Sequence, residues 1–363
     1  MTQESDTDAA LIATLQEASR HAETGEWSTC LTLCRDILDQ DPDIIFANYL
    51  AGIASIQLGA HDNAISYLRA STAPNETDHN KLSMLCDLLL QTGRTEEALP
   101  YLERLAGIAA RPDVLNRLGA IHADAGRIGE AILRFRQSLE ALPEGNVASA
   151  GLYPLLRVTC EWGDELARLS ENIDRLNDAA LQRGETPPEP PFDNVHRVDV
   201  PEVNFRVARS WSAQLERSVG TPLAAREDIR NLTADRRIRV GYLSGDLHDH
   251  AISHLMRGVF RTHDRTAFDI RVYSHGPDRP NAYRDDIRRA CDAFVDIREV
   301  SDTAAAERIQ ADEVDILVDL MGYTRNNRLG ICAMRPAPVQ VTYLGFPGTT
   351  GSDFFDYNIV DPI

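Results

Sequence analysis

The first half of the sequence carries a repeat with a period of 33 to 34 residues, and this repeat restricts the fold more than any other feature. The repeated stretches are TGEWSTCLTLCRDIL, LGAHDNAISYLRAS, TGRTEEALPYLERL and AGRIGEAILRFRQSL. Their turn glycines are Gly25, Gly59, Gly93 and Gly126, and the small residues five positions later are Cys30, Ala64, Ala98 and Ala131. Repeats of this length stack as helical hairpins, so the pattern predicts a four-repeat α-solenoid over residues 1–150.

Glycine and proline mark the boundaries of each predicted hairpin. Glycine reaches the left-handed backbone conformation that a tight turn between helices requires. Pro42 and Pro143 follow their turn glycines by 17 residues and end the second helix, while Gly52 and Gly119 let paired helices approach closely. The stretch resembles tetratricopeptide repeats. We expect a protein or peptide ligand in the concave groove of such a superhelix; the alternative is that the repeats only scaffold or self-associate.

Charge and cysteine usage exclude several classes of function. The net charge of −19 argues against a nucleic-acid partner, because binding a phosphate backbone needs clustered cations. Lys81 is the only lysine, which excludes a lysine-dependent phosphate loop or Schiff base in this sequence. Cys30 and Cys34 lie four residues apart on one helix face, where we expect them to pack as small apolar residues.

The sequence predicts a cytoplasmic protein without a membrane anchor. It contains no run of about 18 apolar residues, as a membrane-spanning helix would need. The acidic start MTQESDTDAALIATL lacks the basic segment and apolar core of a secretory signal. The six cysteines are scattered and fit a reducing compartment.

The second half of the sequence reads as a linker followed by a parallel α/β lobe. The stretch ETPPEPPFDN holds four prolines, so residues 151–235 are expected to form a helical extension and a Pro-rich, extended or partly helical linker. From residue 236 short apolar strands alternate with helices, which predicts a Rossmann-like parallel sheet over 236–363. Ligands of such sheets meet the loops after the strands. These loops are SGDLHDHA, SHGPD, MGYTRNN and LGFPGTTG.

The first of these loops holds the candidates for proton transfer. Asp246 and His250 lie four residues apart where the strand ends and the helix begins. Histidine titrates near neutral pH, which suits it to acid–base work. The alternative is that Asp246 is only the helix N-cap and His250 a solvated turn residue. With His248 and His254, three histidines are present, but no further ligand has a recognisable spacing, so we expect no metal site.

The longer motifs, in their order, resemble one family. They are the repeat array, CEW (Cys160–Trp162), RVGYLSGDLHDHAISHLM, DILVDLMGYT, RPAPVQVTYLGFPGTTG and DYNIVDP. Together they resemble the protein O-GlcNAc transferases, above all the bacterial members, which are related to the plant protein O-fucosyltransferases. The resemblance implies a tetratricopeptide-repeat α-superhelix followed by one Rossmann-like lobe. It also implies inverting transfer of a sugar from a nucleotide donor, UDP-GlcNAc, to Ser or Thr of acceptor proteins, with no separate cofactor.

The resemblance assigns roles to particular residues. His250 would lie beside the donor, with Asp246 supporting the cleft and Tyr323 at the sugar and acceptor side. Leu344, Gly345 and Pro347 match backbone positions that approach the sugar. Ile252 stands where animal members carry a threonine, which leaves the donor identity open, with GDP-fucose as the alternative.

Family members continue with a second lobe that holds most of the nucleotide site. This sequence ends at Ile363, where the first lobe would finish. We therefore expect an incomplete form that is inactive without the second lobe. The rival hypothesis is a non-catalytic repeat adaptor with a degenerate α/β lobe, which the retention of Asp246, His250 and Tyr323 opposes.

Overall fold

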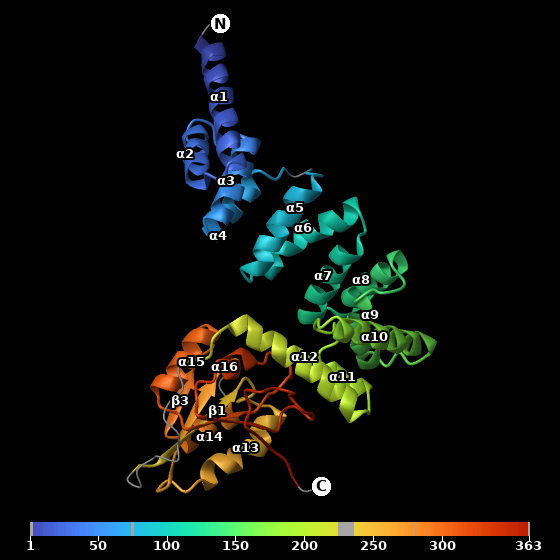
Figure 1. Ribbon diagram of the computed structural model, residues 1–363, viewed down its shortest axis with the longest axis vertical. Helices are drawn as coiled ribbons and strands as arrows, with labels where there is room; N and C mark the ends of the chain where they lie inside the picture. The colour runs from blue at the N-terminus through green and yellow to red at the C-terminus, as the bar shows by residue number, and fades with distance from the viewer. Residues whose placement is uncertain (1–2, 74–75, 224–235, 280, 362–363) are drawn as a thin grey trace. The chain divides into compact units, whose positions relative to one another are not determined.

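The computed structural model describes residues 3–73, 76–223, 236–279 and 281–361. The chain divides into two compact units, Met1–Leu169 and Ser170–Ile363, which Figure 1 shows in blue to green and in green to red. The first unit is helical, and the second holds a parallel sheet with helices on both faces. No helix among the described residues is both long and apolar enough to cross a membrane.

The first unit is a stack of helical hairpins. Its helices are α1 (Gln3–Glu23), α2 (Trp27–Leu38), α3 (Ile45–Gln57), α4 (His61–Ala70), α5 (His79–Gln91), α6 (Thr95–Ile108), α7 (Pro112–Asp124), α8 (Ile128–Ala141) and α9 (Ala148–Val158). Helix α10 (Asp164–Gln182) begins in this unit and continues into the second. The turns that join the first eight in pairs hold Gly25, Gly59, Gly93 and Gly126, with φ angles of 78°, 73°, 73° and 73°. The predicted repeat and its turn glycines are therefore confirmed.

A fifth hairpin, α9–α10, follows the four that the sequence predicted. Its turn residue is Cys160, 34 residues after Gly126 and also left-handed, with φ of 59°. The backbone N–H of Glu161 donates to the carbonyl of Leu156 at 2.8 Å, as Arg127 does to His122 at the preceding turn. The repeat thus runs beyond residue 150 into the predicted extension. A search for turn glycines misses it because a cysteine occupies the glycine's place.

Close helix packing in the repeats depends on residues without bulky side chains. Cys30 and Cys34 are both fully buried in the core of the first hairpins, as expected. Phe135 of α8 lies between two glycines of neighbouring helices. A methyl group at Gly119 would lie 2.7 Å from its ring, and one at Gly151 would lie 2.4 Å from it.

The Pro-rich segment is packed into the second unit instead of forming an extended linker. Helices α11 (Pro191–Arg197) and α12 (Pro201–Val219) follow it directly. Glu189 is buried and accepts hydrogen bonds from Asn177, Asn194 and both Nε and Nη2 of Arg197, at 2.6–2.8 Å. The indole N–H of Trp211 donates to the carbonyls of Pro187 and Glu189. Residues 224–235 of the predicted linker lie outside the described residues.

The sheet has the doubly wound order β3-β2-β1-β4-β5-β6, and every pair of neighbours is parallel. The strands are β1 (Ile238–Ser244), β2 (Phe268–Ser274), β3 (Ala293–Asp296), β4 (Ile316–Asp319), β5 (Val339–Tyr343) and β6 (Tyr357–Ile359). The helices between them are α13 (Ala251–Thr262), α14 (Ala282–Ala290), α15 (Asp302–Ala311) and α16 (Leu329–Ala333). The predicted fold class, an α-helical repeat followed by a parallel α/β lobe, is confirmed.

Successive side chains along each strand point to opposite faces of the sheet, and they form one hydrophobic core on each face. Tyr242 of β1 faces α13 and packs with Met256 and Phe260, whereas Leu243 faces α15 and α16. In Figure 1, α13 and α14 cover one face, and α12, α15 and α16 cover the other. Burying each large apolar side chain contributes about 1.5–3 kcal/mol, so both faces stabilise the sheet. The carboxyl ends of the strands are thereby held on a rigid frame.

The Phe135 contact predicts opposite effects for two glycine-to-alanine substitutions. Gly119→Ala should lower the free energy of unfolding by about 1–3 kcal/mol, because Phe135 cannot retreat from the new methyl group without striking Gly151. The control Gly129→Ala meets no atom within 4 Å and should be neutral or stabilising by up to about 1 kcal/mol. Urea unfolding measures both. Equal effects would contradict this account of the packing.

The fifth turn predicts a stabilising substitution. Cys160→Gly should raise the free energy of unfolding of the repeats by about 1 kcal/mol, because a side chain in the left-handed conformation costs about 1–2 kcal/mol. Cys160→Ala removes the thiol but keeps the strain, and should give no such gain. Thermal unfolding of the two variants separates the backbone effect from loss of the exposed thiol.

Candidate functional site

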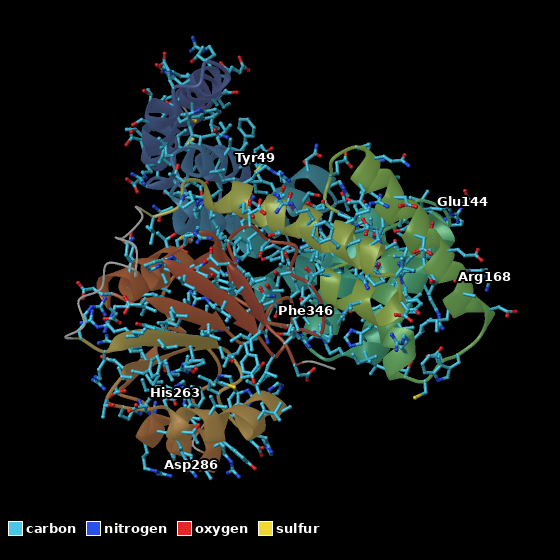
Figure 2. All side chains as sticks on the ribbon, turned by 60° about the horizontal axis from the view of Figure 1, so that its bottom comes forward. Tyr49, Glu144, Arg168, His263, Asp286 and Phe346 are labelled. Atoms are coloured by element: carbon cyan, nitrogen blue, oxygen red, sulfur yellow. The ribbon has the colours of Figure 1, made fainter. Side chains whose placement is uncertain are left out.

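The candidate site lies at the carboxyl ends of the strands, where the strand order reverses between β1 and β4. In doubly wound sheets this switch point is where ligands bind. The four predicted loops follow β1, β2, β4 and β5, so they lie along this one edge. Figure 2 labels Phe346, which follows β5, at this edge.

The loops touch through their backbones. The N–H of Gly245 donates to the sulfur of Met321 at 2.9 Å. A methyl group at Gly276 would lie 1.7 Å from the carbonyl oxygen of Gly245, and one at Gly345 would lie 2.2 Å from that of Leu320. Gly276 and Gly345 are therefore restricted to glycine by space alone. The contacts tie the loop after β1 to those after β2 and β4, and the loop after β4 to that after β5.

Asp246 and His250 form a pair at the lip of this edge. Their Oδ2 and Nδ1 atoms are 3.6 Å apart, and their side chains are 19% and 42% exposed. Burial raises the pKa of Asp246, and the neighbouring His250 and His248 partly oppose that rise. The pair is therefore accessible to a ligand, with the carboxyl group the more enclosed of the two.

His250, and not Asp246, is the N-cap of α13. Its Nδ1 accepts the backbone N–H of Ile252 at 3.3 Å. The alternative considered above, with Asp246 as the cap, is wrong. Because Nδ1 acts as an acceptor, the neutral ring carries its proton on Nε2, which is the nitrogen left for a ligand. The side chain of Ile252 is buried in the core below α13.

The other two histidines of this loop have different surroundings. The rings of His248 and His250 meet edge-on with centroids 5.6 Å apart. His254 bonds to Asp249 at 2.9 Å and stacks on Tyr283 at 4.1 Å, so its hydrogen bond is satisfied within the protein. Among the described residues, no three His, Cys, Asp or Glu side chains come together to hold a metal ion.

Tyr323 is directed toward α12. Its hydroxyl donates to the carbonyl of Ala208 at 3.3 Å, and its ring meets Phe346 edge-on at 5.6 Å. Burial raises the pKa of the phenol. The ring also packs against the core on the α15–α16 face, opposite the face that α13 covers. The structure thus brings Tyr323 beside the loop after β5, while its hydroxyl is engaged with a helix.

The loop after β5 combines two left-handed residues in succession. Leu344 has φ of 54° and Gly345 has φ of 59°. Such a conformation costs a side chain about 1–3 kcal/mol, and it tends to occur at functional sites. Pro347 is exposed two residues later. Gly345 therefore has a structural reason to be glycine in addition to the role that the resemblance implies.

Two titratable residues at this edge were not singled out from the sequence. Asp319 ends β4, is 2% exposed, and accepts the N–H groups of Gly322 at 2.6 Å and Met321 at 3.3 Å. Burial raises its pKa to about 6. His275 follows β2 and lies against Gly245, and burial lowers its pKa to about 4. Their position directly at a strand end was the signal available in the sequence.

The family model of glycosyl transferase family 41 matches residues 217–363. The chain is 31% identical over 212 residues to a probable UDP-N-acetylglucosamine–peptide N-acetylglucosaminyltransferase, SEC of Arabidopsis thaliana, covering 57% of this chain and 22% of the relative. It is 37% identical over 132 residues to the Arabidopsis protein SPINDLY, which bears the same enzyme description, covering 36% and 14%. The chain thus spans about a fifth or less of these relatives.

Among solved structures, a mutant O-GlcNAc transferase of Thermobaculum terrenum aligns with 99% of this chain and 55% of its own, at 23% identity and a TM-score of 0.44. The family match and the curated relatives confirm the expected relationship to the protein O-GlcNAc transferases. They also support the class of glycosyltransferase for the lobe that carries the candidate site.

The buried carboxyl group of Asp319 predicts a pH-dependent difference in stability. Its folded pKa of about 6 lies above the value of an unfolded aspartate, so the folded state prefers the protonated form. Ionising this buried carboxyl group lowers the stability of the folded state. This loss is absent below about pH 4, grows as the pH rises, and is complete above about pH 6. Between pH 4 and pH 6 the free energy of unfolding of Asp319→Asn should therefore rise, relative to that of the wild type, by on the order of 3 kcal/mol.

Urea unfolding at pH 4, 5, 6 and 7 measures this difference. Asparagine keeps an acceptor oxygen for Gly322, so the comparison isolates the charge. The control Asp285→Asn changes an exposed carboxylate of the same lobe and should follow the wild-type pH profile. A constant offset between Asp319→Asn and the wild type at all four pH values would contradict the buried, protonated carboxyl group.

Proposed function

We propose that this chain takes part in protein O-glycosylation, transferring a sugar from a nucleotide donor to Ser or Thr of an acceptor protein. The observation that carries the proposal is the family match over 217–363, on a lobe whose switch-point loop holds Asp246 and His250. The Rossmann-like lobe would form one wall of the donor site. The repeats would bind part of the acceptor protein in their groove.

The proposed donor is UDP-GlcNAc, with inversion at the sugar carbon. The curated relatives are described as peptide N-acetylglucosaminyltransferases, which supports this donor. GDP-fucose is the alternative within the same reaction class, since Ile252 cannot supply a hydroxyl group to the donor. Stabilisation of the leaving diphosphate would supply most of the rate. The reaction is proposed to use the donor without a separate cofactor, in the cytoplasm.

His250 is proposed to position the donor. Its Nε2 is the ring nitrogen not used in capping α13, and the 42% exposed side chain can reach a ligand at the loop. Asp246 would help to orient the ring, because its Oδ2 lies 3.6 Å from Nδ1, the nitrogen that faces away from the ligand. Because His250 also begins α13, the position of its ring is fixed by a helix.

Tyr323 is proposed to act through the loop after β5. Its hydroxyl bonds to Ala208, so the ring edge against Phe346 is the part that faces this loop. Leu344, Gly345 and Pro347 would present backbone groups to the sugar, with the left-handed pair setting their direction. Moving the bound sugar by about 1 Å at such a site can lower the rate of transfer by on the order of 10²-fold.

The proposal predicts different effects on sugar transfer for two histidines at the start of α13. In the complete protein that contains this sequence, His250→Ala should lower sugar transfer by on the order of 10²-fold, because the donor loses a positioning contact. His254→Ala is the matched control: His254 is exposed and already bonded to Asp249, and transfer should change less than threefold. Intact-mass analysis of an acceptor peptide measures transfer.

The donor is tested by titration calorimetry with UDP-GlcNAc, UDP and GDP-fucose. We expect saturable heat with UDP-GlcNAc and UDP. Heat and transfer with GDP-fucose alone would reassign the donor within the same class. No binding of any of the three, together with no transfer, would contradict the enzyme and favour the repeat adaptor.

A further inference from the structure

A cavity of about 420 Å³ lies at the other end of α13 from the candidate site. It is lined by Arg261, Arg265, Asp286, Arg289, Ala290, Cys291 and Asp292. His250 caps the start of α13 and Arg261 lies in its last turn, and these ends are about 17 Å apart for a twelve-residue helix. In Figure 2, His263, which follows α13, and Phe346 are labelled at separate places on the lobe. The cavity is therefore separate from the loops proposed to bind the donor.

One carboxylate in this cavity holds three guanidinium groups from two helices. Asp286 of α14 lies 2.6 Å from Arg261, 2.5 Å from Arg289 and 3.8 Å from Arg257. In the part of the chain that the structure describes, these three arginines form ion pairs with no other carboxylate. The group thus carries two excess positive charges, although the whole chain has a net charge of −19.

The excess charge is only partly explained by helix termini. Cations commonly stabilise the carboxyl ends of helices, and Arg261 and Arg289 lie in the last turns of α13 and α14. Each helix end contributes roughly half a negative charge, so two ends offset about one of the two excess charges. The cluster remains cationic. Helix capping also gives no reason for both arginines to converge on one carboxylate.

The arginines around Asp286 are exposed enough for their N–H groups to reach a ligand. Asp286 is 19% exposed and lies beneath Arg261 and Arg289, which are 57% and 70% exposed. Each of these two arginines donates to Asp286 through Nη2, so its remaining N–H groups are not used in the described contacts. The carboxylate therefore orients two guanidinium groups at the mouth of the cavity.

The floor of the cavity is fixed, and its one carboxylate, Asp292, is balanced by arginines. Arg265 bonds to Asp292 and donates to the carbonyl of Phe260 at 3.0 Å. Asp292 is shared with Arg237 at 3.0 Å. Burial raises the pKa of Cys291 to about 11, so its side chain is a neutral thiol.

We propose that this cavity binds the phosphate group of a small phosphate monoester, with Arg261 and Arg289 as the donors. Guanidinium groups bind phosphate oxygens in a bidentate manner, and two that are already oriented lose less entropy on binding. The volume is in the range of small-molecule sites and exceeds that of a phosphate ion, which favours a phosphate attached to an organic group. The site is independent of the proposed sugar transfer.

The test is titration calorimetry of the full chain at constant ionic strength, with glycerol 3-phosphate and inorganic phosphate as probes and sodium chloride as the blank. We expect saturable binding of glycerol 3-phosphate, tighter than that of inorganic phosphate. The double variant Arg261→Gln/Arg289→Gln should weaken binding at least tenfold. The matched control Arg308→Gln, an exposed arginine of the same lobe that pairs with Asp312, should bind as the wild type does.

Circular dichroism shows whether the double variant is folded. If it is not, the single variant Arg289→Gln, whose side chain is the most exposed of the cluster, should still weaken binding at least threefold. Inorganic phosphate binding as tightly as the monoester would identify free phosphate as the ligand. Equal affinity in the wild type and the arginine variants, or a response that does not saturate, would overturn the proposal.

Discussion

The candidate site depends on backbone-to-backbone contact at the carboxyl edge of the sheet. Gly276 lies against the carbonyl of Gly245, and Gly345 lies against that of Leu320, at distances that leave no room for a β-carbon. These contacts fix four loops on strands that are buried on both faces. Asp246, His250 and the left-handed pair at Leu344 and Gly345 thus stand on a rigid frame, as a site that must position a ligand requires.

Several titratable groups at the same edge have pKa values that burial shifts toward the neutral form. The pKa of Asp319 rises to about 6, that of Asp246 also rises, and that of His275 falls to about 4. In each case the enclosed backbone favours the neutral form. The carboxyl group of Asp319, with a pKa of about 6, is therefore ionised at a higher pH than an exposed aspartate and becomes neutral only as the pH falls below about 6. This electrostatic character follows from the close loop contacts.

Much of the architecture could be read from the sequence because it has a period. The 34-residue spacing of glycines predicted the hairpins, and the alternation of strands and helices predicted the parallel sheet. The fifth hairpin was missed because Cys160 adopts a conformation that glycine usually supplies. The Pro-rich stretch was read as a linker, but the buried Glu189 network holds it against α10, α11 and α12.

Side-chain direction at the site was less predictable. The sequence placed Asp246 and His250 at one turn, but which of them caps α13 depends on local backbone geometry. Tyr323 was expected at the acceptor side, and only the packing of α12 shows where its hydroxyl is bonded. Contacts between residues more than a hundred positions apart leave no periodic trace in a single sequence. The roles of His250, Asp246, Tyr323, Leu344, Gly345 and Pro347 remain predictions.

The central claim is that the glycine-lined carboxyl edge of the sheet binds a nucleotide sugar. Amide chemical-shift mapping of ¹⁵N-labelled protein with UDP-GlcNAc tests it most directly, because Gly245, Gly322 and Gly345 each supply a backbone reporter at that edge. The account predicts saturable shifts at these three amides and at Ile252, whose N–H is bonded to His250. Shifts confined to the repeats, or the absence of saturable shifts at the edge, would contradict it.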